Sequence, residues 1–333
     1  DFSVVTNNGL IDVTASGVTG GDGNSIVNNG EIFSDTIEEE GDSNTVIHVE
    51  DFNYVENNGL IESMYAGGIQ VGYNSTVVNN GTINASSINA ANGIDGQDDN
   101  LVYNYGEINA IYDWSEPVME PIMEPIIGDI DHSHGIHVLS NNEVYNYGTI
   151  TASTAGIEGF GDNNLIVNEA GGQIYAQEIG ISVGRDDEVM LMFEEEEELL
   201  GNTVINYGII GDDPYAPSDN VYNSAVVRGI IATGPATVYN YNTIHATYAG
   251  ISTMGDGDLV VNGEDGVIYV YGNDEFAPSP GIMVVGGDAG ISVGAPWMLD
   301  KDEKIFLLGE PIEEDTTLGV GDAQALYNGI INN

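Results

Sequence analysis

A short phrase of alternating apolar and polar residues recurs along the chain. It reads TVVNNGTINA from Thr76, LVYNYGEINA from Leu101, EVYNYGTITA from Glu143, SIVNNGEIFS from Ser25 and TVINYGIIGD from Thr203. Apolar residues occupy every second position on both sides of an Asn-x-Gly corner, which is the pattern of short strands with one buried face. We therefore expect two strands joined by a tight corner wherever the phrase occurs.

A second phrase follows the first and supplies another strand. It reads GGIQVGYNS at Gly67, HGIHVLSNN at His134, AGIEGFGDNN at Ala155, IGISVGRDD at Ile179 and AGISTMGDGD at Ala249. Each example contains Gly-Ile, three of them as Gly-Ile-x-Val, and each leads into a corner that contains Gly, Asp or Asn, which favour turns. One repeat unit thus predicts three short strands and three corners.

The spacing of the corners predicts a solenoid. The nearest corners lie 21 or 22 residues apart, as from Asn7 to Asn28 and from Asn57 to Asn79, and about 20 to 25 residues is the length of one solenoid turn. Decayed corners also occur at Asn168, Asn223 and Asn328. We expect one all-β domain over residues 1–333, a parallel β-helix of about 12 coils of about 21–25 residues. The handedness rule for parallel crossovers favours a right-handed coil.

The recurrent asparagine has a structural interpretation. Glycine accepts the backbone conformation of a tight corner, and asparagine can bond to local backbone or stack on the asparagine of the next coil. We expect a structural ladder made of Asn7, Asn28, Asn57, Asn79, Asn104, Asn146, Asn206, Asn240 and Asn262.

The stretches NNGEI, NYGTI and AGIEGFGDNN resemble the parallel β-helical passenger regions of bacterial autotransporter adhesins and haemagglutinin-like exoproteins. The resemblance extends over nearly the whole chain outside its insertions. It implies a right-handed β-helix that is exported to the cell surface. No membrane barrel or signal segment that would support the export route of that group is readable in these residues.

Three longer gaps between corners predict insertions, at about residues 111–134, 185–202 and 295–318. The first holds a Glu-Pro repeat, and proline cannot donate within a central strand ladder. The second joins an apolar run to five glutamates, and both tryptophans of the chain lie in the first and third. We expect these segments to project as loops or to cover a flank of the solenoid, and their Met and Trp residues leave a subunit contact equally open.

Composition restricts the partners. The 333 residues carry 4 Lys and Arg against 54 Asp and Glu, a formal charge of −50, yet 41% of them are hydrophobic, which favours a folded core over an acidic disordered chain. So negative a chain disfavours nucleic acid and anionic membranes, and no apolar run is long enough to insert into a bilayer. Halophilic adaptation and cation capture both explain the acidity.

Several corners offer oxygen ligands for calcium, which binds six to eight oxygens at flexible sites. GGDGN, GDSN, GDNN and GDGD are such corners, although the same residues are also good turn formers. The candidate calcium residues are Asp22, Asn24, Asp42, Asp162, Asp256 and Asp258.

The stretch HSHGIH suggests a different metal through His132, His134 and His137. On a straight strand His132 and His134 share a face and His137 lies on the other, so a three-ligand site requires a bend at Gly135.

No catalytic pattern stands out. A β-helical polysaccharide lyase requires a basic proton acceptor, and the candidates are Arg185, Arg228, Lys301 and Lys304. A glycosidase requires two carboxylates at a defined separation, and 54 acidic residues make such a pair uninformative. The chain has no cysteine, which excludes thiol catalysis.

The first and last residues, DFSVVTNNG and QALYNGIINN, both have strand patterns. An uncapped coil exposes unpaired backbone groups, so either the solenoid continues or its ends stack on other copies. We expect a non-enzymatic, extracellular or cell-surface protein that self-assembles head to tail into a filament or surface layer, with calcium as a possible stabiliser. The alternatives are an adhesin rod that binds glycans or a host surface, and a calcium-dependent polysaccharide-degrading enzyme.

Overall fold

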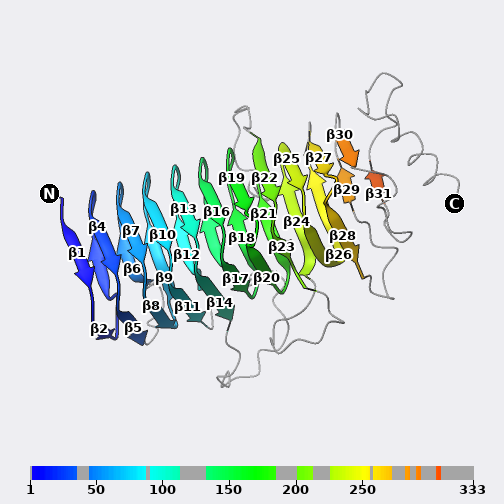
Figure 1. Ribbon diagram of the computed structural model, residues 1–333. Helices are drawn as coiled ribbons and strands as arrows, with labels where there is room; N and C mark the ends of the chain where they lie inside the picture. The colour runs from blue at the N-terminus through cyan, green and yellow to red at the C-terminus, as the bar shows by residue number, and fades with distance from the viewer. Residues whose placement is uncertain are drawn as a thin grey trace, which may run out of the picture. The chain divides into compact units, whose positions relative to one another are not determined.

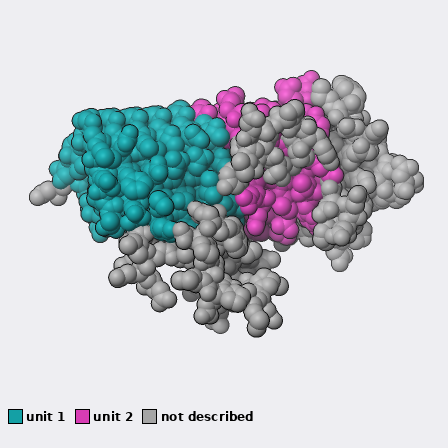
Figure 2. All heavy atoms as spheres, turned by 90° about the horizontal axis from the view of Figure 1, so that it is seen from below, with its two compact units in different colours: residues 1–138, 148–158 teal, residues 139–147, 159–333 magenta. Residues whose placement is uncertain are grey.

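The computed structural model describes residues 2–35, 45–87, 91–112, 133–184, 201–212, 226–255, 258–271, 282–285, 290–293 and 305–308. Every regular element in these ranges is a β-strand, and the paired strands are parallel. The strands form a β-solenoid of about eight turns. The chain divides into two compact units, residues 1–138 with 148–158 and residues 139–147 with 159–333 (Figure 2).

In the first unit the strands form three rows, each with one strand per turn (Figure 1). The first row contains β1 (Val4–Asn7), β4 (Ser25–Asn28), β7 (Tyr54–Asn57), β10 (Thr76–Asn79) and β13 (Leu101–Asn104). The second contains β2 (Leu10–Val13), β5 (Glu31–Asp35), β8 (Leu60–Met64), β11 (Thr82–Ser87), β14 (Glu107–Tyr112) and β17 (Thr149–Ala152). The third contains β3 (Val18–Gly20), β6 (Thr45–Val49), β9 (Gly67–Val71), β12 (Ile94–Gly96), β15 (Ile136–Val138) and β18 (Ala155–Gly159).

The second unit repeats these three rows. Its first row contains β16 (Glu143–Asn146), β19 (Leu165–Asn168), β22 (Asn202–Asn206), β25 (Ala236–Asn240), β27 (Leu259–Asn262) and β30 (Gly290–Val293). Its second contains β20 (Gln173–Ala176), β23 (Ile209–Ile210), the first part of β26 (Thr243–Met254) and β28 (Val267–Val270). Its third contains β21 (Ile179–Val183), β24 (Val226–Thr233), the second part of β26, β29 (Ile282–Val285) and β31 (Ile305–Leu308).

Stacked isoleucines form the core of the first unit. Ile32, Ile61, Ile83, Ile108 and Ile150 are register partners from one turn to the next, and none is exposed to solvent. A branched side chain repeated at one position packs on its copy in the neighbouring turn, so each turn completes the burial of the next. The row of β6, β9, β12 and β15 carries a similar fully buried stack of Ile47, Ile69, Ile94 and Ile136.

A ladder of buried asparagine amides runs beside this core at the end of the first row. In the first unit the side-chain nitrogens of Asn7, Asn28, Asn57 and Asn79 each donate to the side-chain oxygen of the next ladder asparagine at 2.8–2.9 Å. In the second unit the same bonds join Asn146, Asn168, Asn206, Asn240 and Asn262 at 2.7–2.9 Å. The amides thereby satisfy one another away from water.

The glycine of each Asn-x-Gly corner lets the backbones of successive turns approach closely. A Cβ atom on Gly30, Gly59 or Gly81 would lie 1.9–2.1 Å from the carbonyl oxygen of the corresponding glycine in the preceding turn. No side chain fits at that distance. The corner glycine is therefore required by stacking, and its φ angle is not the reason.

The expected number of about 12 coils was wrong. Eight successive turns, β1 to β24, have three separate strands each, and beyond them β26 runs through two rows as one continuous strand. The estimate counted Asn223 and Asn328 as corners, and both lie outside the described residues. Asn206 bonds directly to Asn240, so no ladder position exists between them.

The expected insertions lie largely outside the described residues. At their margins, Ile111 and Tyr112 belong to β14, and Asn202 begins β22. The segment 295–318 includes β31, which pairs in parallel with β29. In the part of the chain that the structure describes, no helix is long and apolar enough to cross a membrane.

Substitution Gly81→Ala should destabilise the fold, because its Cβ would lie 2.0 Å from the carbonyl oxygen of Gly59. We expect a loss of about 2 kcal/mol or more in the free energy of unfolding, measured by urea titration. Gly9→Ala is the matched control, since the same corner position in the first turn has no atom within 4 Å of the added Cβ. Equal losses in both variants would contradict the close-approach explanation.

Substitution Asn79→Ala should interrupt the buried ladder. It removes the donor of the Asn104 oxygen at 2.8 Å and the acceptor of the Asn57 amide at 2.8 Å, which leaves that amide only longer bonds of 3.3 Å to backbone carbonyl oxygens. We expect a loss of about 2–4 kcal/mol, since each buried unpaired polar group costs about 1–3 kcal/mol. The control Asn80→Ala, at the exposed neighbouring position, should lose less than about 1 kcal/mol in the same titration.

Candidate functional site

A row of polar side chains lies along the outer face of the third row of strands in the first unit. Because side chains alternate across a strand, the residue between the two inward apolar residues of each strand points outward. These outward positions are occupied in successive turns by His48, Gln70, Asp95, His137 and Glu158. The row is the strongest concentration of titratable groups with direct mutual contacts in the described part of the first unit.

The side chains of the row bond to one another from turn to turn. His48 Nδ1 lies 2.7 Å from Gln70 Oε1, and Gln70 Nε2 donates to Asp95 Oδ2 at 3.2 Å. Asp95 Oδ1 lies 2.8 Å from His137 Nδ1, whose ring presents Nε2 to Glu158 Oε2 at 3.7 Å. The parallel register, which aligns these positions, therefore converts five separate sequence positions into one polar chain.

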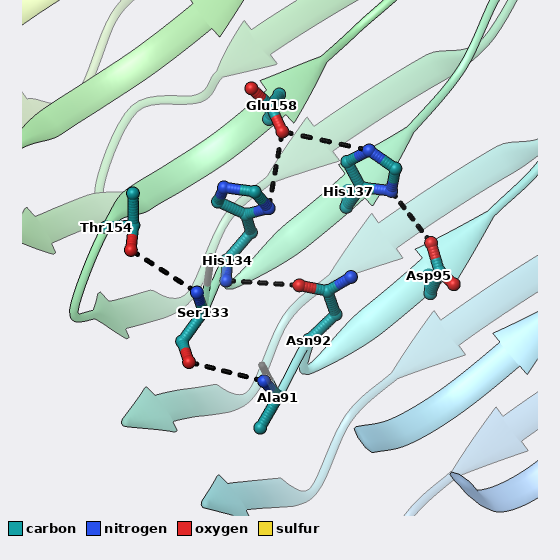
Figure 3. A network of polar contacts seen from close by, with 8 residues as sticks. All are labelled: Ala91, Asn92, Asp95, Ser133, His134, His137, Thr154 and Glu158. Carbon is teal, nitrogen blue, oxygen red and sulfur yellow. Dashed lines mark hydrogen bonds and ion pairs between the residues drawn. The ribbon is translucent and has the colours of Figure 1, made fainter. Parts of the chain in front are cut away.

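His134 joins the row because the chain bends at Gly135 immediately before β15. Its Nδ1 lies 3.3 Å from Glu158 Oε2, and its ring stacks on that of His137 with centroids 5.6 Å apart (Figure 3). On a straight strand these two histidines would lie on opposite faces, and the bend at Gly135 that a shared site requires is present. His132 lies outside the described residues.

Backbone contacts hold this bend in place. The backbone nitrogen of His134 donates to Asn92 Oδ1 at 3.2 Å, and that of Ser133 donates to Thr154 Oγ1 at 3.3 Å (Figure 3). The Ser133 hydroxyl accepts from the backbone nitrogen of Ala91 at 3.2 Å. Three neighbouring turns therefore position the paired imidazoles.

The carboxylates on both sides of His137 favour its protonated form. Burial lowers the pKa of His137, but the hydrogen bond to Asp95 and the negative charges of Asp95 and Glu158 outweigh burial and raise this pKa above its ordinary value of 6.5. The site can thus hold a proton between two carboxylates close to neutral pH. Within the described ranges, no three His, Asp or Glu side chains are grouped so that they could hold a metal ion.

The residues expected to bind calcium lie at separate corners. Asp22 Oδ1 accepts from the backbone nitrogen of Asp51 at 3.2 Å, and Asn24 Nδ2 donates to the carbonyl of Gly21 at 2.7 Å. The backbone nitrogen of Asp162 donates to Ser140 Oγ at 3.2 Å. These contacts stabilise turns. Asp42 and Asp256 lie outside the described residues.

Asn24 and Asp258 belong to a second column that the sequence analysis missed. At this column a backbone nitrogen donates to a side-chain oxygen of the next turn: Asn24 to Asn53 Oδ1 at 2.7 Å and Ala236 to Asp258 Oδ1 at 2.9 Å. The other Asp258 oxygen accepts from the backbone nitrogen of Gly255 at 2.8 Å, and the residue is buried. The signal in the sequence is an Asn or Asp directly before many strands of the first row, as before β4, β7 and β27.

No family model, no curated protein and no solved structure matches this chain. The description of the site therefore depends on the contacts within the chain itself. The likeness to autotransporter passenger regions stays an expectation from the sequence.

The charge of His137 should be measurable by NMR titration of its ring protons. We expect a pKa above 6.5 in the native chain, and a lower pKa in Asp95→Asn, which removes one of the two neighbouring negative charges. A titration midpoint that Asp95→Asn leaves unchanged would contradict the assigned cause.

The positive charge of protonated His137 should stabilise the folded chain at acid pH. Because the folded-state pKa is raised, the contribution is fully present below pH 6.5 and is lost as the pH rises through the folded-state value. His137→Gln should therefore lower the melting temperature relative to the native chain more at acid pH than at alkaline pH. A difference independent of pH would show that the ring stabilises by packing alone.

Proposed function

We propose that this chain is a structural subunit that assembles through coil-on-coil stacking of right-handed β-helices into an extracellular filament or surface layer. The repeat supports this role, because each coil buries the apolar side chains of its neighbour. A coil of another copy can make the same contact. The role proposed is structural and non-enzymatic. The passenger-type resemblance of the repeats supports a location outside the cell or on its surface.

The observation that carries the proposal is the shared register in which each turn stacks on the next, so that inward side chains are fully buried where neighbouring turns cover them. Val5 is 39% exposed, whereas its register partner in the next turn, Ile26, is 2% exposed. Ile11 is likewise partly exposed, whereas its register partner Ile32 is fully buried. The side chains and strand edges here are those that a coil in the same register covers elsewhere in the unit. In the proposed assembly, a coil of another copy covers inward side chains of this kind.

The charge of the chain determines what such an assembly requires. Copies that each carry a formal charge of −50 repel one another. Screening or bridging by cations offsets this repulsion, and calcium suits carboxylate and carbonyl oxygens. Calcium therefore enters the proposal as a stabiliser between copies, with no residue of the described corners assigned as its ligand.

A second candidate function, an adhesin rod, is favoured by exposed tyrosines of the second unit. Tyr207 is 39% exposed and stacks on Tyr241 with ring centroids 5.1 Å apart, and Tyr239 stacks on Tyr241 at 6.1 Å. Aromatic clusters at a surface are frequent in binding sites. Retention of the chain on immobilised neutral glycans, lost in Tyr207→Leu, would support the adhesin rod.

Electron microscopy of the purified chain tests the assembly. We expect filaments or sheets in millimolar calcium that shorten or dissolve when the calcium is chelated. Assemblies that persist after chelation would show that copies stack without calcium. Single short particles in both conditions, together with a monomeric sedimentation coefficient, would contradict the assembly role.

A charge at Val5 of β1 should prevent stacking between copies without unfolding the chain. Val5→Lys places an ammonium where the next coil would pack, so we expect assembly to be lost while the circular dichroism of the strands stays unchanged. Val227→Lys on β24 is the matched control, because Val227 has the same 39% exposure and belongs to neither β1 nor β2. Equal assembly of both variants would show that this side of the first turn is not the contact.

A further inference from the structure

A second column of asparagines lies on the surface of the first unit, one residue after the buried ladder. It contains Asn8, Asn29, Asn58 and Asn80, all exposed to solvent, and is named here the Asn-Gly column. Their side-chain amides bond in sequence, from Asn29 to Asn8 at 3.0 Å, from Asn58 to Asn29 at 2.9 Å and from Asn80 to Asn58 at 2.8 Å. The column is an exposed copy of the buried ladder.

Each asparagine of this column is followed by glycine, at Gly9, Gly30, Gly59 and Gly81. An Asn-Gly peptide is the sequence most prone to spontaneous deamidation, because glycine has no side chain to hinder its own nitrogen. That nitrogen attacks the asparagine Cγ, the new N–Cγ bond closes a succinimide, and Nδ2 leaves as ammonia with the displaced proton. Water then opens the ring to aspartate or isoaspartate.

At three of the four positions the fold retains the reactive glycine because no other residue fits. A Cβ at Gly30, Gly59 or Gly81 would collide with the carbonyl oxygen of the preceding corner glycine. The asparagines, in contrast, can be replaced, since Tyr105 holds the same position before Gly106 in the next turn. The column therefore brings four reactive dipeptides together in adjacent turns.

The buried ladder restrains the atom that must attack. The backbone nitrogen of Gly9 donates to Asn7 Oδ1 at 3.0 Å, and that of Gly59 donates to Asn57 Oδ1 at 3.3 Å. Gly30 donates to Asn28 Oδ1 at 3.3 Å, and Gly81 donates to the carbonyl of Asn57 at 2.9 Å. Attack on Cγ requires this hydrogen bond to break and the amide of the exposed asparagine to leave its own column.

We propose that the Asn-Gly column is a site of spontaneous covalent modification that the buried asparagine ladder controls. While the corners are closed, the ladder holds the glycine nitrogens and deamidation is slow. When a corner opens, deamidation proceeds at the rate of an unfolded chain, and its product prevents the corner from closing again. The proposal holds for the chain alone and is independent of its assembly.

The product is incompatible with the column for two reasons. A carboxylate at residue 58 cannot donate to Asn29 Oδ1, so the bond at 2.9 Å becomes a contact between two oxygens. Isoaspartate adds a carbon atom to the backbone just before Gly59, which lies against the turns on both sides. Like charges repeated about 4.8 Å apart along the column would also repel.

Peptide mapping of the full chain tests the control by the ladder. Native and denatured chains are incubated at mildly alkaline pH and cleaved by a protease specific for acidic residues, since the chain has only 4 Lys and Arg. We expect deamidation at Asn29, Asn58 and Asn80 to be at least tenfold slower in the native chain. Equal rates in the two states would overturn the proposal.

A ladder variant separates the effect of the hydrogen bond from that of the fold. Asn57→Ala removes the acceptor of the Gly59 nitrogen, so we expect deamidation of Asn58 to accelerate several-fold while Asn8, beside the intact Asn7, keeps its native rate. If deamidation at both Asn58 and Asn8 accelerates to the rate of the denatured chain, the variant has unfolded. The variant Asn58→Asp, which imitates the product, then tests the proposal. An unchanged rate at Asn58 in a folded variant would overturn the role of the ladder.

Product variants test the consequence directly. Asn58→Asp should lower the melting temperature by roughly 2–4 °C more than Asn74→Asp does. Asn74→Asp adds the same charge at an exposed corner between β9 and β10. Asn74 has a φ of 54°, which aspartate also accepts, so this control adds no backbone strain. Equal shifts would show that deamidation does not disturb the column and would overturn the proposed loss of closure.

Discussion

The hydrogen bond between the buried amides of successive turns is the constraint on which the rest of the structure depends. A buried amide that lacks partners costs about 1–3 kcal/mol, and each ladder asparagine is largely or fully removed from solvent. The cost is avoided when each Nδ2 faces the Oδ1 of the next turn at about 2.8 Å, as between Asn28 and Asn57, and longer bonds to backbone carbonyl oxygens add to this pairing. A shift of one residue would place these amides on the outer face, so the ladder fixes the register of every turn.

Register then determines every other column. It stacks isoleucine on isoleucine in the core, brings corner glycines into backbone contact and aligns the outward residues of the third row. The exposed Asn-Gly column follows from the same alignment, because it lies one residue after the ladder. One repeated interaction therefore sets both the apolar packing inside and the polar chemistry outside.

The row from His48 to Glu158 shows how such columns acquire individual properties. Its backbone is equivalent in each turn, but its side chains differ, and that difference places His137 between two carboxylates and raises its pKa. The solenoid thus provides a regular support on which local electrostatics vary from turn to turn.

The sequence by itself determined the fold class, because the alternation within strands and the Asn-x-Gly corner record the strand and the turn locally. Asn57 and Asn79 could be assigned to one ladder from their spacing, since that position recurs in turn after turn. The number of turns was misjudged because Asn223 has the local pattern of a corner, whereas the contact from Asn206 to Asn240 decides which corners stack.

Only the tertiary structure decided the site. His134 and His137 share a carboxylate because neighbouring turns bend the chain at Gly135, and Asp95 reaches His137 across 42 residues. The structural role of Asn24 and Asp258 at corners also depends on backbone hydrogen bonds between adjacent turns. Local patterns determine what each turn is, but the contacts between turns depend on insertion lengths and register, which no local pattern contains.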